Sequence, residues 1–312
     1  MYNNSFRIRI ATGTLTLPCM AGIATLLFPL PAFSDLLLWL GLGFIALNTY
    51  LLAELNNRHT LIRVRSRMVC STFLALYASC PPLHSWTFAL IPMLCLILSY
   101  FQFFYSYQEA RPQFHVFQGF LYLGIASWFY PMLLLMVPVL YVCLLIPLRA
   151  LTWRSFFSGG LGILLPFWFY SGWAIWNEQL DTAFATIGRA FLFPLPDYTV
   201  VPMAVKTTFL FTALSAIAAI VHLLYTAYND KIRTRMYYYV IICVELLLLA
   251  ACLLQPQHYR VLLSLLIANS APLIAHHYTL AKGRIMDYWF VIALVFLSLI
   301  TLFNYTDLWK NL

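Results

Sequence analysis

Residues 237–254 read YYYVIICVELLLLAACLL, a run of eighteen residues whose single charged side chain is Glu245. A helix that crosses a bilayer needs about 20 mostly apolar residues. Backbone polar groups cannot stay unpaired in lipid, and a helix closes its hydrogen bonds within its own backbone. This stretch therefore predicts a membrane-spanning helix.

Ten other stretches of the chain have the same character. The eleven predicted spans lie at 12–31, 35–55, 68–82, 85–107, 115–130, 132–148, 155–176, 201–227, 236–254, 260–277 and 286–304. Two neighbouring pairs are divided by prolines alone, one pair by Pro81 and Pro82 and the other by Pro131. Proline breaks a helix because it lacks an N–H and clashes with the preceding turn. Each pair could instead form one kinked or re-entrant unit, so the predicted count is about eleven, within nine to eleven.

The composition of the whole chain is typical of a polytopic membrane protein. Hydrophobic residues make up 63% of the 312 residues, aromatic residues 17% and charged residues 9%. Soluble domains carry about 25% charged residues, and Trp and Tyr concentrate at membrane interfaces. We expect an all-α polytopic integral membrane protein, with one transmembrane domain over residues 1–312 and no soluble domain.

The basic residues segregate when the predicted loops are assigned alternately to the two sides of the membrane. The side of the N-terminus holds Arg7, Arg9, Arg58, Arg63, Arg65, Arg67, Arg111, Arg149, Arg154, Lys231, Arg233, Arg235, Lys282 and Arg284, fourteen of the 18 basic residues. The other side holds Arg189, Lys206, Arg260 and Lys310, with Asp35, Glu178, Asp181, Asp197 and Asp307. Lys and Arg concentrate in cytoplasmic loops. We therefore expect a multi-pass protein of the bacterial inner (cytoplasmic) membrane, with the N-terminus inside and the C-terminus outside.

The first apolar run has an alternative interpretation as a cleaved signal peptide. Arg7 and Arg9 precede it, and the small residues of 32–34, AFS, resemble a cleavage site. The next hydrophobic run follows almost at once and many spans come after it, which favours a retained first helix.

The net charge of +8 does not indicate a nucleic-acid partner, because the basic residues form short clusters between apolar runs. The seven cysteines lie in apolar stretches without a C-x-x-C motif, so we expect small buried hydrophobes. His276 and His277 are adjacent and point about 100° apart on a helix, which makes a poor metal pair. We expect no metal, no cofactor and no nucleic acid, and membrane lipids as partners.

Glu245 is the acidic residue placed near the middle of a predicted span. A charge at that depth costs about 3 kcal/mol by insertion scales, so the side chain should be paired, protonated or functional. Asn48, Gln102 and Asn269 are the polar partners available in other spans. Glu245 and Asn269 could line a transport path, or a protonated Glu245 could bond to a polar group of a neighbouring helix.

Both predicted faces carry residues suited to anionic lipid. On the outer side, Asp35 and His84 lie at turns, and the turn 255–260, QPQHYR, ends with Arg260 at the membrane boundary. An arginine there can hold a lipid phosphate through two parallel hydrogen bonds, or extend to phospholipid headgroups without a specific role. On the inner side, residues 62–67 read IRVRSR. This cluster could bind anionic lipid or serve as a topology signal alone. The outer segment 177–200 is predicted to lie as an amphipathic stretch on the membrane surface.

Two stretches resemble a known class of membrane enzymes. Residues 117–131, FQGFLYLGIASWFYP, are followed by an apolar run, by Arg149, Trp153 and Arg154, and by a second apolar run that ends at Pro166. Residues 258–263, HYRVLL, open an apolar run that reaches Pro272. Both resemble the GT-C fold, that of membrane glycosyltransferases that use polyprenyl-phosphate sugars. The chain also resembles an uncharacterised family of polytopic bacterial inner-membrane proteins.

The resemblance implies roles for three residues of the outer face. Asp35 would be the catalytic base, and Arg260 with His258 would bind the lipid phosphate of a polyprenyl-phosphate carrier. GT-C enzymes usually have a long first external loop with one or two acidic residues, one of which is a base or a metal ligand, and a large external domain. In this chain the loop is a few residues around Asp35 with no acidic pair, and we expect no large external domain. A relative of this kind would be truncated, inactive or dependent on a partner.

Three hypotheses of function follow from the sequence. The first is a GT-C-like glycosyltransferase, or an inactive relative, that handles a polyprenyl-phosphate-linked sugar at the outer leaflet. The second is a non-catalytic scaffold or assembly subunit with a membrane-protein partner. The third is a transporter or lipid flippase with Glu245 and Asn269 along its path. Whether the chain is an enzyme stays open at this point.

Overall fold

The computed structural model describes residues 6–29, 33–178 and 195–310, and within these ranges the chain is all-helical and contains no strand. The helices are α1 (Phe6–Thr12), α2 (Thr16–Leu27), α3 (Leu36–His59), α4 (Met68–Ala78), α5 (Ile91–Tyr105), α6 (Gln113–Phe129), α7 (Met136–Leu145), α8 (Trp153–Trp176), α10 (Met203–Thr226), α11 (Ile232–Leu254), α12 (Tyr259–Leu280) and α13 (Arg284–Lys310). Short 3₁₀ turns, among them η4 (Ala227–Asn229) and η5 (Pro256–His258), lie in several connections. The prediction of an all-α fold is confirmed for these residues.

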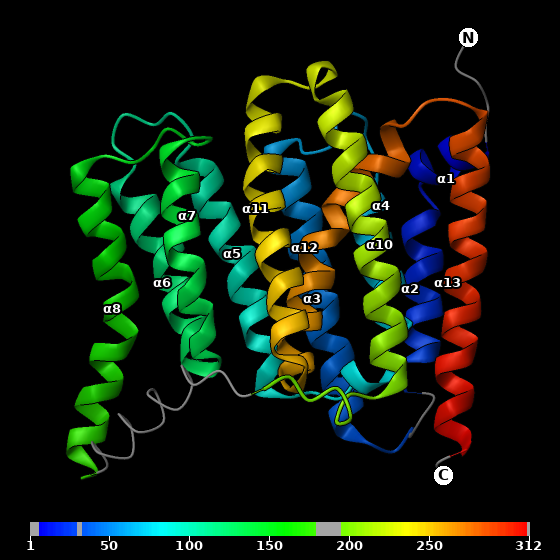
Figure 1. Cartoon of the computed structure of the whole chain (residues 1–312), viewed down its shortest axis with the longest axis horizontal. Coiled ribbons are helices and arrows are strands. Elements are labelled where there is room, and N and C mark those ends of the chain that lie inside the picture. The colour runs from blue at the N-terminus through cyan, green and yellow to red at the C-terminus, as the bar shows by residue number, and fades with distance from the viewer. Residues whose placement is uncertain (1–5, 30–32, 179–194, 311–312) are drawn as a thin grey trace.

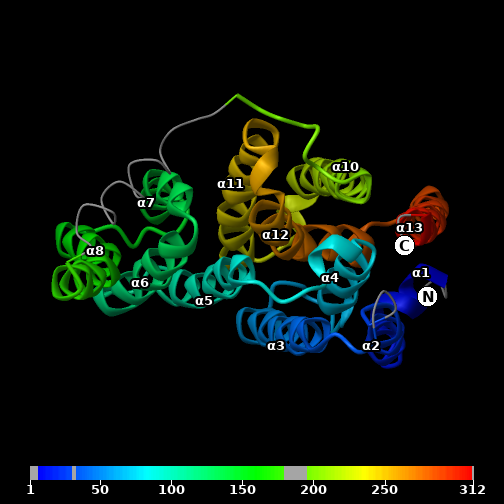
Figure 2. The same ribbon diagram turned by 90° about the horizontal axis from the view of Figure 1, so that it is seen from below.

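Helix α12 is the centre of the molecule (Figure 2). It packs against α4, α5, α10 and α11, and its apolar segment is entirely buried inside the protein. Helices α6, α7 and α8 lie at one end of the assembly, and α2 and α13 lie at the other (Figure 2). A helix that is covered on all sides can carry polar side chains, because its neighbours rather than lipid surround them.

Six helices are long and apolar enough to cross a membrane. They are Leu36–His59, Phe88–Tyr105, Met203–Asn229, Ile232–Leu254, Pro256–Leu280 and Arg284–Thr306. Each of the eleven predicted segments overlaps a helix, but α4 and α7 have only 11 and 10 residues. The architecture is thus compatible with a multi-pass membrane protein, and the count of eleven spans stays a prediction.

The first predicted span, 12–31, starts at a break between two helices in the structure. Helices α1 and α2 meet at an angle of 80°, and Gly13 lies at the break. The carbonyl of Ile10 accepts from the Thr16 hydroxyl at 2.5 Å and from the Gly13 N–H at 3.3 Å. Glycine weakens a helix, and a threonine side chain can compete for its backbone groups. A hydropathy pattern does not register either effect.

The close packing of α6 on α8 depends on glycine. A Cβ atom on Gly162 would lie 2.4 Å from the carbonyl oxygen of Phe117, and one on Gly124 would lie 2.9 Å from that of Ile163. Small residues let two membrane helices bring their backbones together. The glycine-spaced stretch in 117–131 therefore has a packing role in this fold.

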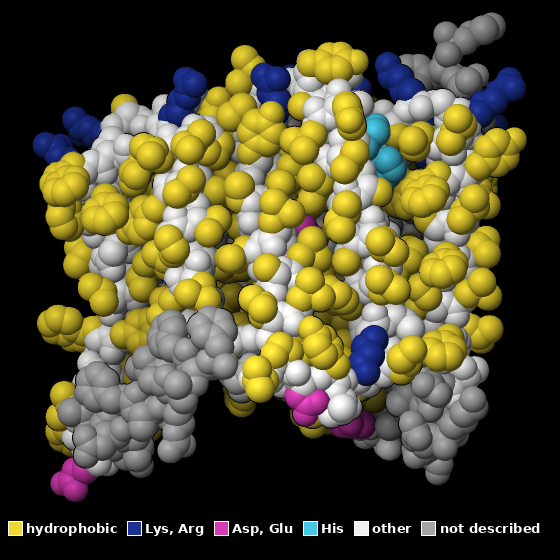
Figure 3. Space-filling view, viewed as in Figure 1, with side chains coloured by type: hydrophobic (Ala, Val, Ile, Leu, Met, Phe, Trp, Pro, Cys, Tyr) yellow, Lys and Arg dark blue, Asp and Glu magenta, His cyan; other side chains and the backbone are white. Residues whose placement is uncertain are grey.

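The charged residues divide between two edges of the molecule. The connections that hold the basic clusters, including α3–α4, α7–α8, α10–α11 and α12–α13, meet at the edge where α1 begins, whereas α13 ends at the opposite edge (Figure 1). Figure 3 shows most Lys and Arg side chains of this face along the first edge and acidic side chains along the other. We call the first edge the basic edge. Most cysteines are buried or half-buried, but Cys19 and Cys243 are exposed, which corrects the expectation that all seven are buried.

Candidate functional site

A cavity of about 930 Å³ opens at the basic edge, where the α3–α4 connection meets the α10–α11 connection. We call it the basic cavity. Its polar and charged lining consists of Asn56, Asn57, Thr60, Arg63, Arg65, Ser66, Arg67, Asn229, Asp230, Lys231 and Thr234. Four cationic side chains and one carboxylate therefore surround a space large enough for a small ligand.

The α3–α4 connection is held in place by specific contacts. Thr60 ends α3 with a left-handed backbone, φ 49°, and the side chain of Asn56 accepts a hydrogen bond from the Ile62 N–H at 3.2 Å. Further along, the Ser66 hydroxyl donates to the carbonyl of Ala11 at 2.5 Å, and Arg67 donates to the carbonyl of Thr14 at 3.1 Å. These bonds fix the arginine-bearing segment at the rim of the cavity.

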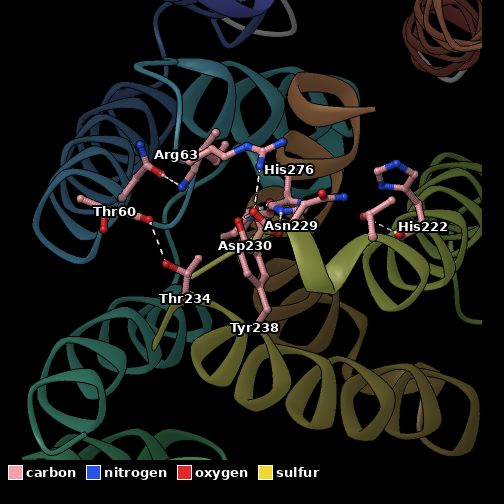
Figure 4. A network of polar contacts seen from close by, with 12 residues as sticks. Thr60, Arg63, His222, Asn229, Asp230, Thr234, Tyr238 and His276 are labelled. Carbon is pink, nitrogen blue, oxygen red and sulfur yellow. Dashed lines mark hydrogen bonds and ion pairs between the residues drawn. The ribbon is translucent and has the colours of Figure 1, made fainter. Parts of the chain in front are cut away.

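The α10–α11 connection supplies the one carboxylate of the lining. Asp230 accepts a hydrogen bond from Nε2 of His276, on α12, at 2.9 Å, and Arg63 lies 4.0 Å away (Figure 4). Arg63 also donates to the carbonyl of Asn229 at 2.9 Å. The side chains of Asp230 and His276 are 7% and 1% exposed, so this pair is a structural element of the cavity wall.

Two further cations of the lining have unused donors. In the part of the chain that the structure describes, the side chains of Arg65 and Lys231 are exposed and make no hydrogen bond or ion pair with protein. The carboxylate of Asp230 lies 4.0 Å from Arg63 and is bonded to His276, and it forms no ion pair with Arg65 or Lys231. Guanidinium and ammonium donors of this kind favour phosphate and carboxylate ligands.

A second cavity, of about 350 Å³, shares a wall with the first. Arg63, Asn229 and Asp230 line both cavities, and His222 and Lys282 line only the second. The basic lining is thus continuous around the α10–α11 turn, with Lys282 added from the α12–α13 connection.

Glu245 lies in the core at the junction of α5, α11 and α12 and is fully buried. Its Oε2 accepts from the amide of Asn269 at 2.7 Å, and its Oε1 lies 2.5 Å from the Ser270 hydroxyl. The Asn269 amide also donates to the carbonyl of Ile241, and its oxygen accepts from the Tyr100 hydroxyl. The structure therefore brings Glu245 and Asn269 together, and adds Ser270 and Tyr100.

Both carboxyl oxygens of Glu245 have a hydrogen-bond partner within the protein. The Ser270 hydroxyl lies 2.5 Å from Oε1 of Glu245 and 2.7 Å from the carbonyl of Leu266, one turn earlier on the same helix. Oε2 accepts from the amide of Asn269. A buried polar group requires such partners.

The residues predicted for the outer face make separate local contacts. Asp35 caps α3, because its Oδ1 accepts from the Leu37 N–H at 2.9 Å. Arg260 contacts Tyr259 at 3.4 Å, and the His258 ring packs 5.1 Å from that of Tyr130. Among the described residues, no hydrogen bond or ion pair joins Asp35 to His258 or Arg260.

His84 is buried in the connection between α4 and α5, at the edge opposite the basic one. Its ring stacks on Phe28 with 3.9 Å between centroids, and its Nε2 lies 3.2 Å from the carbonyl of Tyr77. Burial lowers the pKa of His84 to about 4. At neutral pH this ring is uncharged and packs as an aromatic group.

The predicted amphipathic segment 177–200 lies largely outside the described residues. No protein-family model, no curated protein and no solved structure matches this chain.

Proposed function

We propose that this protein is a multi-pass membrane protein that binds a phosphate-bearing anion in the basic cavity. The observation that supports the proposal is the lining of that cavity, where Arg65 and Lys231 have free donors and the one carboxylate, Asp230, is held by His276. Arg63 and Arg67 extend the positive rim on either side of Arg65. A phosphate placed among these groups would replace the hydrogen bonds that the two free cations make with water.

The orientation that we propose places the basic cavity on the cytoplasmic side of a bacterial inner membrane. The clustering of cations at one edge supports it through the positive-inside rule. Eleven spans, with the N-terminus inside and the C-terminus outside, belong to the same proposal. Single cysteines at Arg65 and Gln257, in a cysteine-free background, test it with a membrane-impermeant thiol reagent. Labelling of Arg65→Cys from the outside of intact cells would contradict this orientation.

The anion that we propose is the phosphate of a lipid headgroup. The basic cavity opens at the edge of a bundle of apolar helices, which is the level at which headgroups lie. A polyprenyl-phosphate carrier is one lipid with this chemistry, and an anionic phospholipid is another. A soluble phosphate compound is the competing source of the same group.

The test is a binding measurement on the purified full chain in neutral detergent. Native mass spectrometry would compare the wild type with the Arg65→Gln/Lys231→Gln variant, using phosphatidate and inorganic phosphate as separate probes. Removing two cations that each contribute about 1 kcal/mol to binding lowers the affinity by about thirtyfold. The matched control is Arg154→Gln, which removes an exposed cation of the same edge that does not line the cavity. Equal binding by all three proteins would overturn the proposal.

A second proposal is a GT-C-like glycosyltransferase with its site at the opposite edge. The observation that favours it is the position of Arg260, exposed at the start of α12 and two residues from His258. Asp35 would act as base only after leaving its capping bond to Leu37. An Asp35→Asn variant keeps an oxygen acceptor for the cap, and it should lose transfer to a polyprenyl-phosphate-dependent glycan while staying folded. Full activity of this variant would exclude Asp35 as the base.

A further inference from the structure

We infer that the ligand of the basic cavity is a lipid whose hydrocarbon chain lies in an apolar groove between α13 and the bundle. The inference rests on the proposed binding of a lipid phosphate in the basic cavity and adds the site at which the hydrocarbon chain of that lipid binds. The groove holds about 90 Å³ and its walls are almost wholly apolar. Met20 of α2, Ala75 of α4, Phe211 of α10, Ile274 of α12 and Leu297 of α13 each contribute to it.

The groove exists because α13 stands apart from the rest of the helices. Figure 2 shows α13 at the edge of the assembly, beyond α4 and α10. Its apolar segment is only 6% buried, whereas that of α12 is completely buried. Helix α13 packs mainly on α10 and on the short α1, so its first half leaves space beside α2 and α4.

The groove and the basic cavity are neighbours that share two short segments of chain. On α2, Thr16 lines the groove and Leu17 lines the cavity. At the start of α4, Met68, Ser71 and Thr72 face the groove, whereas residues 67, 69 and 70 face the cavity. Successive helical residues point about 100° apart, so one helix can present side chains to both spaces. The two spaces therefore lie on either side of α2 and the first turn of α4.

The groove is apolar and the neighbouring basic cavity is polar and cationic, which matches the apolar chain and the anionic headgroup of a lipid. The groove begins beside Ile10 and Met68 at the basic edge and continues along α4 to Leu76, eight residues further. At 1.5 Å per residue this is about 12 Å of depth into the apolar zone. A chain in the groove would bring its phosphate to the basic edge, where Arg67 lines the neighbouring basic cavity and donates to Thr14 at the α1–α2 break. The hydrocarbon chain of the lipid thus binds in the apolar groove, and its phosphate binds beside the hydrogen-bond donors of the basic cavity.

A matched pair of substitutions on α13 tests the inference. Leu297→Trp fills the groove, because Leu297 is half-buried and lines it. Leu299→Trp makes the same chemical change two residues away on a side chain that is 56% exposed. Binding of dioleoyl phosphatidate and of inorganic phosphate is measured for both variants in neutral detergent, with thermal unfolding as a check on folding.

We expect Leu297→Trp to weaken binding of the long-chain phosphatidate by about tenfold and to leave binding of inorganic phosphate unchanged. We expect Leu299→Trp to change neither. If the wild type binds inorganic phosphate but Leu297→Trp leaves phosphatidate binding intact, the groove has no role and the proposed phosphate site stands. If the wild type binds neither probe, the proposed function fails and this inference fails with it.

A second measurement covers the case in which Leu297→Trp does not fold. A phosphatidate with a photoactivatable group in its acyl chain is crosslinked to the wild-type protein, and the modified peptides are identified. Labels on α4 and α13 near Ala75 and Ala293, which both line the groove, are the expected result. Labels confined to the exposed outer face of α13, around Leu299, would overturn the inference.

Discussion

The Glu245 cluster and the basic cavity are two polar regions built in opposite ways. Glu245, Asn269 and Ser270 are fully or almost fully buried and satisfy one another's hydrogen bonds. The basic cavity instead encloses about 930 Å³ and exposes the donors of Arg65 and Lys231. A polar group in apolar surroundings must form its hydrogen bonds within the protein. A polar group at a solvent-filled cavity can bond to water, and a ligand can later replace that water.

The difference indicates which region stabilises the fold and which one binds. A cluster with every donor and acceptor matched has nothing left to offer a substrate, so removing one member should damage the protein itself. A cavity with surplus cations contributes little to folding, because exposed charges are worth little. Substitutions in the Glu245 cluster should therefore lower the stability of the protein, and substitutions in the basic cavity should change ligand binding with little effect on stability.

The largest effect is expected from Glu245→Ala. The change removes the carboxyl group, leaves Asn269 and Ser270 without their partner and opens a cavity, so we expect a loss of about 4 kcal/mol in unfolding free energy. Glu245→Gln should cost less than about 1 kcal/mol, because its amide can donate to Ser270 and its oxygen can accept from Asn269. Unfolding titrations in mixed micelles measure both. A Gln variant as unstable as the Ala variant would show that an amide cannot replace the hydrogen bonds of the carboxyl group.

The next largest effect is a loss of stability at low pH that we assign to His84, a second buried polar group. Its folded-state pKa of about 4 lies below the ordinary value of 6.5, so the unfolded chain binds the proton more readily between these values. Stability is then fully present above pH 6.5 and falls as the pH drops towards 4, by about 3 kcal/mol for this group. His84→Gln should remove that part of the pH dependence. Equal slopes in wild type and variant between pH 7 and 4 would mean that folding does not lower the pKa of His84.

The helices are predictable from the sequence because hydrophobic runs are local. Each predicted span overlaps a helix, and Pro131 marks the boundary between α6 and the 3₁₀ turn before α7. The break between α1 and α2 is not predicted, since it depends on Gly13 and on one side-chain bond of Thr16. A hydropathy profile is an average over many residues, so a single glycine or threonine hardly changes it and the break stays undetected.

The sites are less predictable because they join distant segments. Asn269 is a candidate partner of Glu245 by residue type, but Ser270 is not, since serine is common in apolar helices. The Asp230–His276 pair spans 46 residues of sequence, and a lone aspartate in a loop gives no signal of it. The arginines of 62–67 are visible in the sequence, whereas the cavity between two connections becomes visible only in the fold.

A smaller effect is expected from ionic strength, which should act on the basic cavity and not on the Glu245 cluster. Raising the ionic strength from about 0.01 M to about 1 M shortens the Debye length from about 30 Å to about 3 Å, so phosphate binding in the basic cavity should weaken by about tenfold. The Glu245 cluster is fully buried and out of reach of dissolved ions, so its contribution to stability should not respond to salt. Two quantities are measured at both ionic strengths. One is the difference in unfolding free energy between wild type and Glu245→Ala, and the other is the binding constant of the wild type for inorganic phosphate. Salt-independent binding would mean that charge does not drive ligand capture.

The smallest effect is expected from Asp230→Asn, which removes the one carboxylate of the cavity lining. The cavity becomes more positive, so the affinity for inorganic phosphate should rise by about threefold, the scale of one partly screened charge. Asp287→Asn is the matched control, because Asp287 pairs with Arg7 near the same edge and does not line the cavity. The amide oxygen that replaces the carboxylate can still accept from His276, which preserves the wall. Weaker binding by a folded Asp230→Asn variant would show that Asp230 holds Arg63 in place for the ligand, and that geometry outweighs net charge in this cavity.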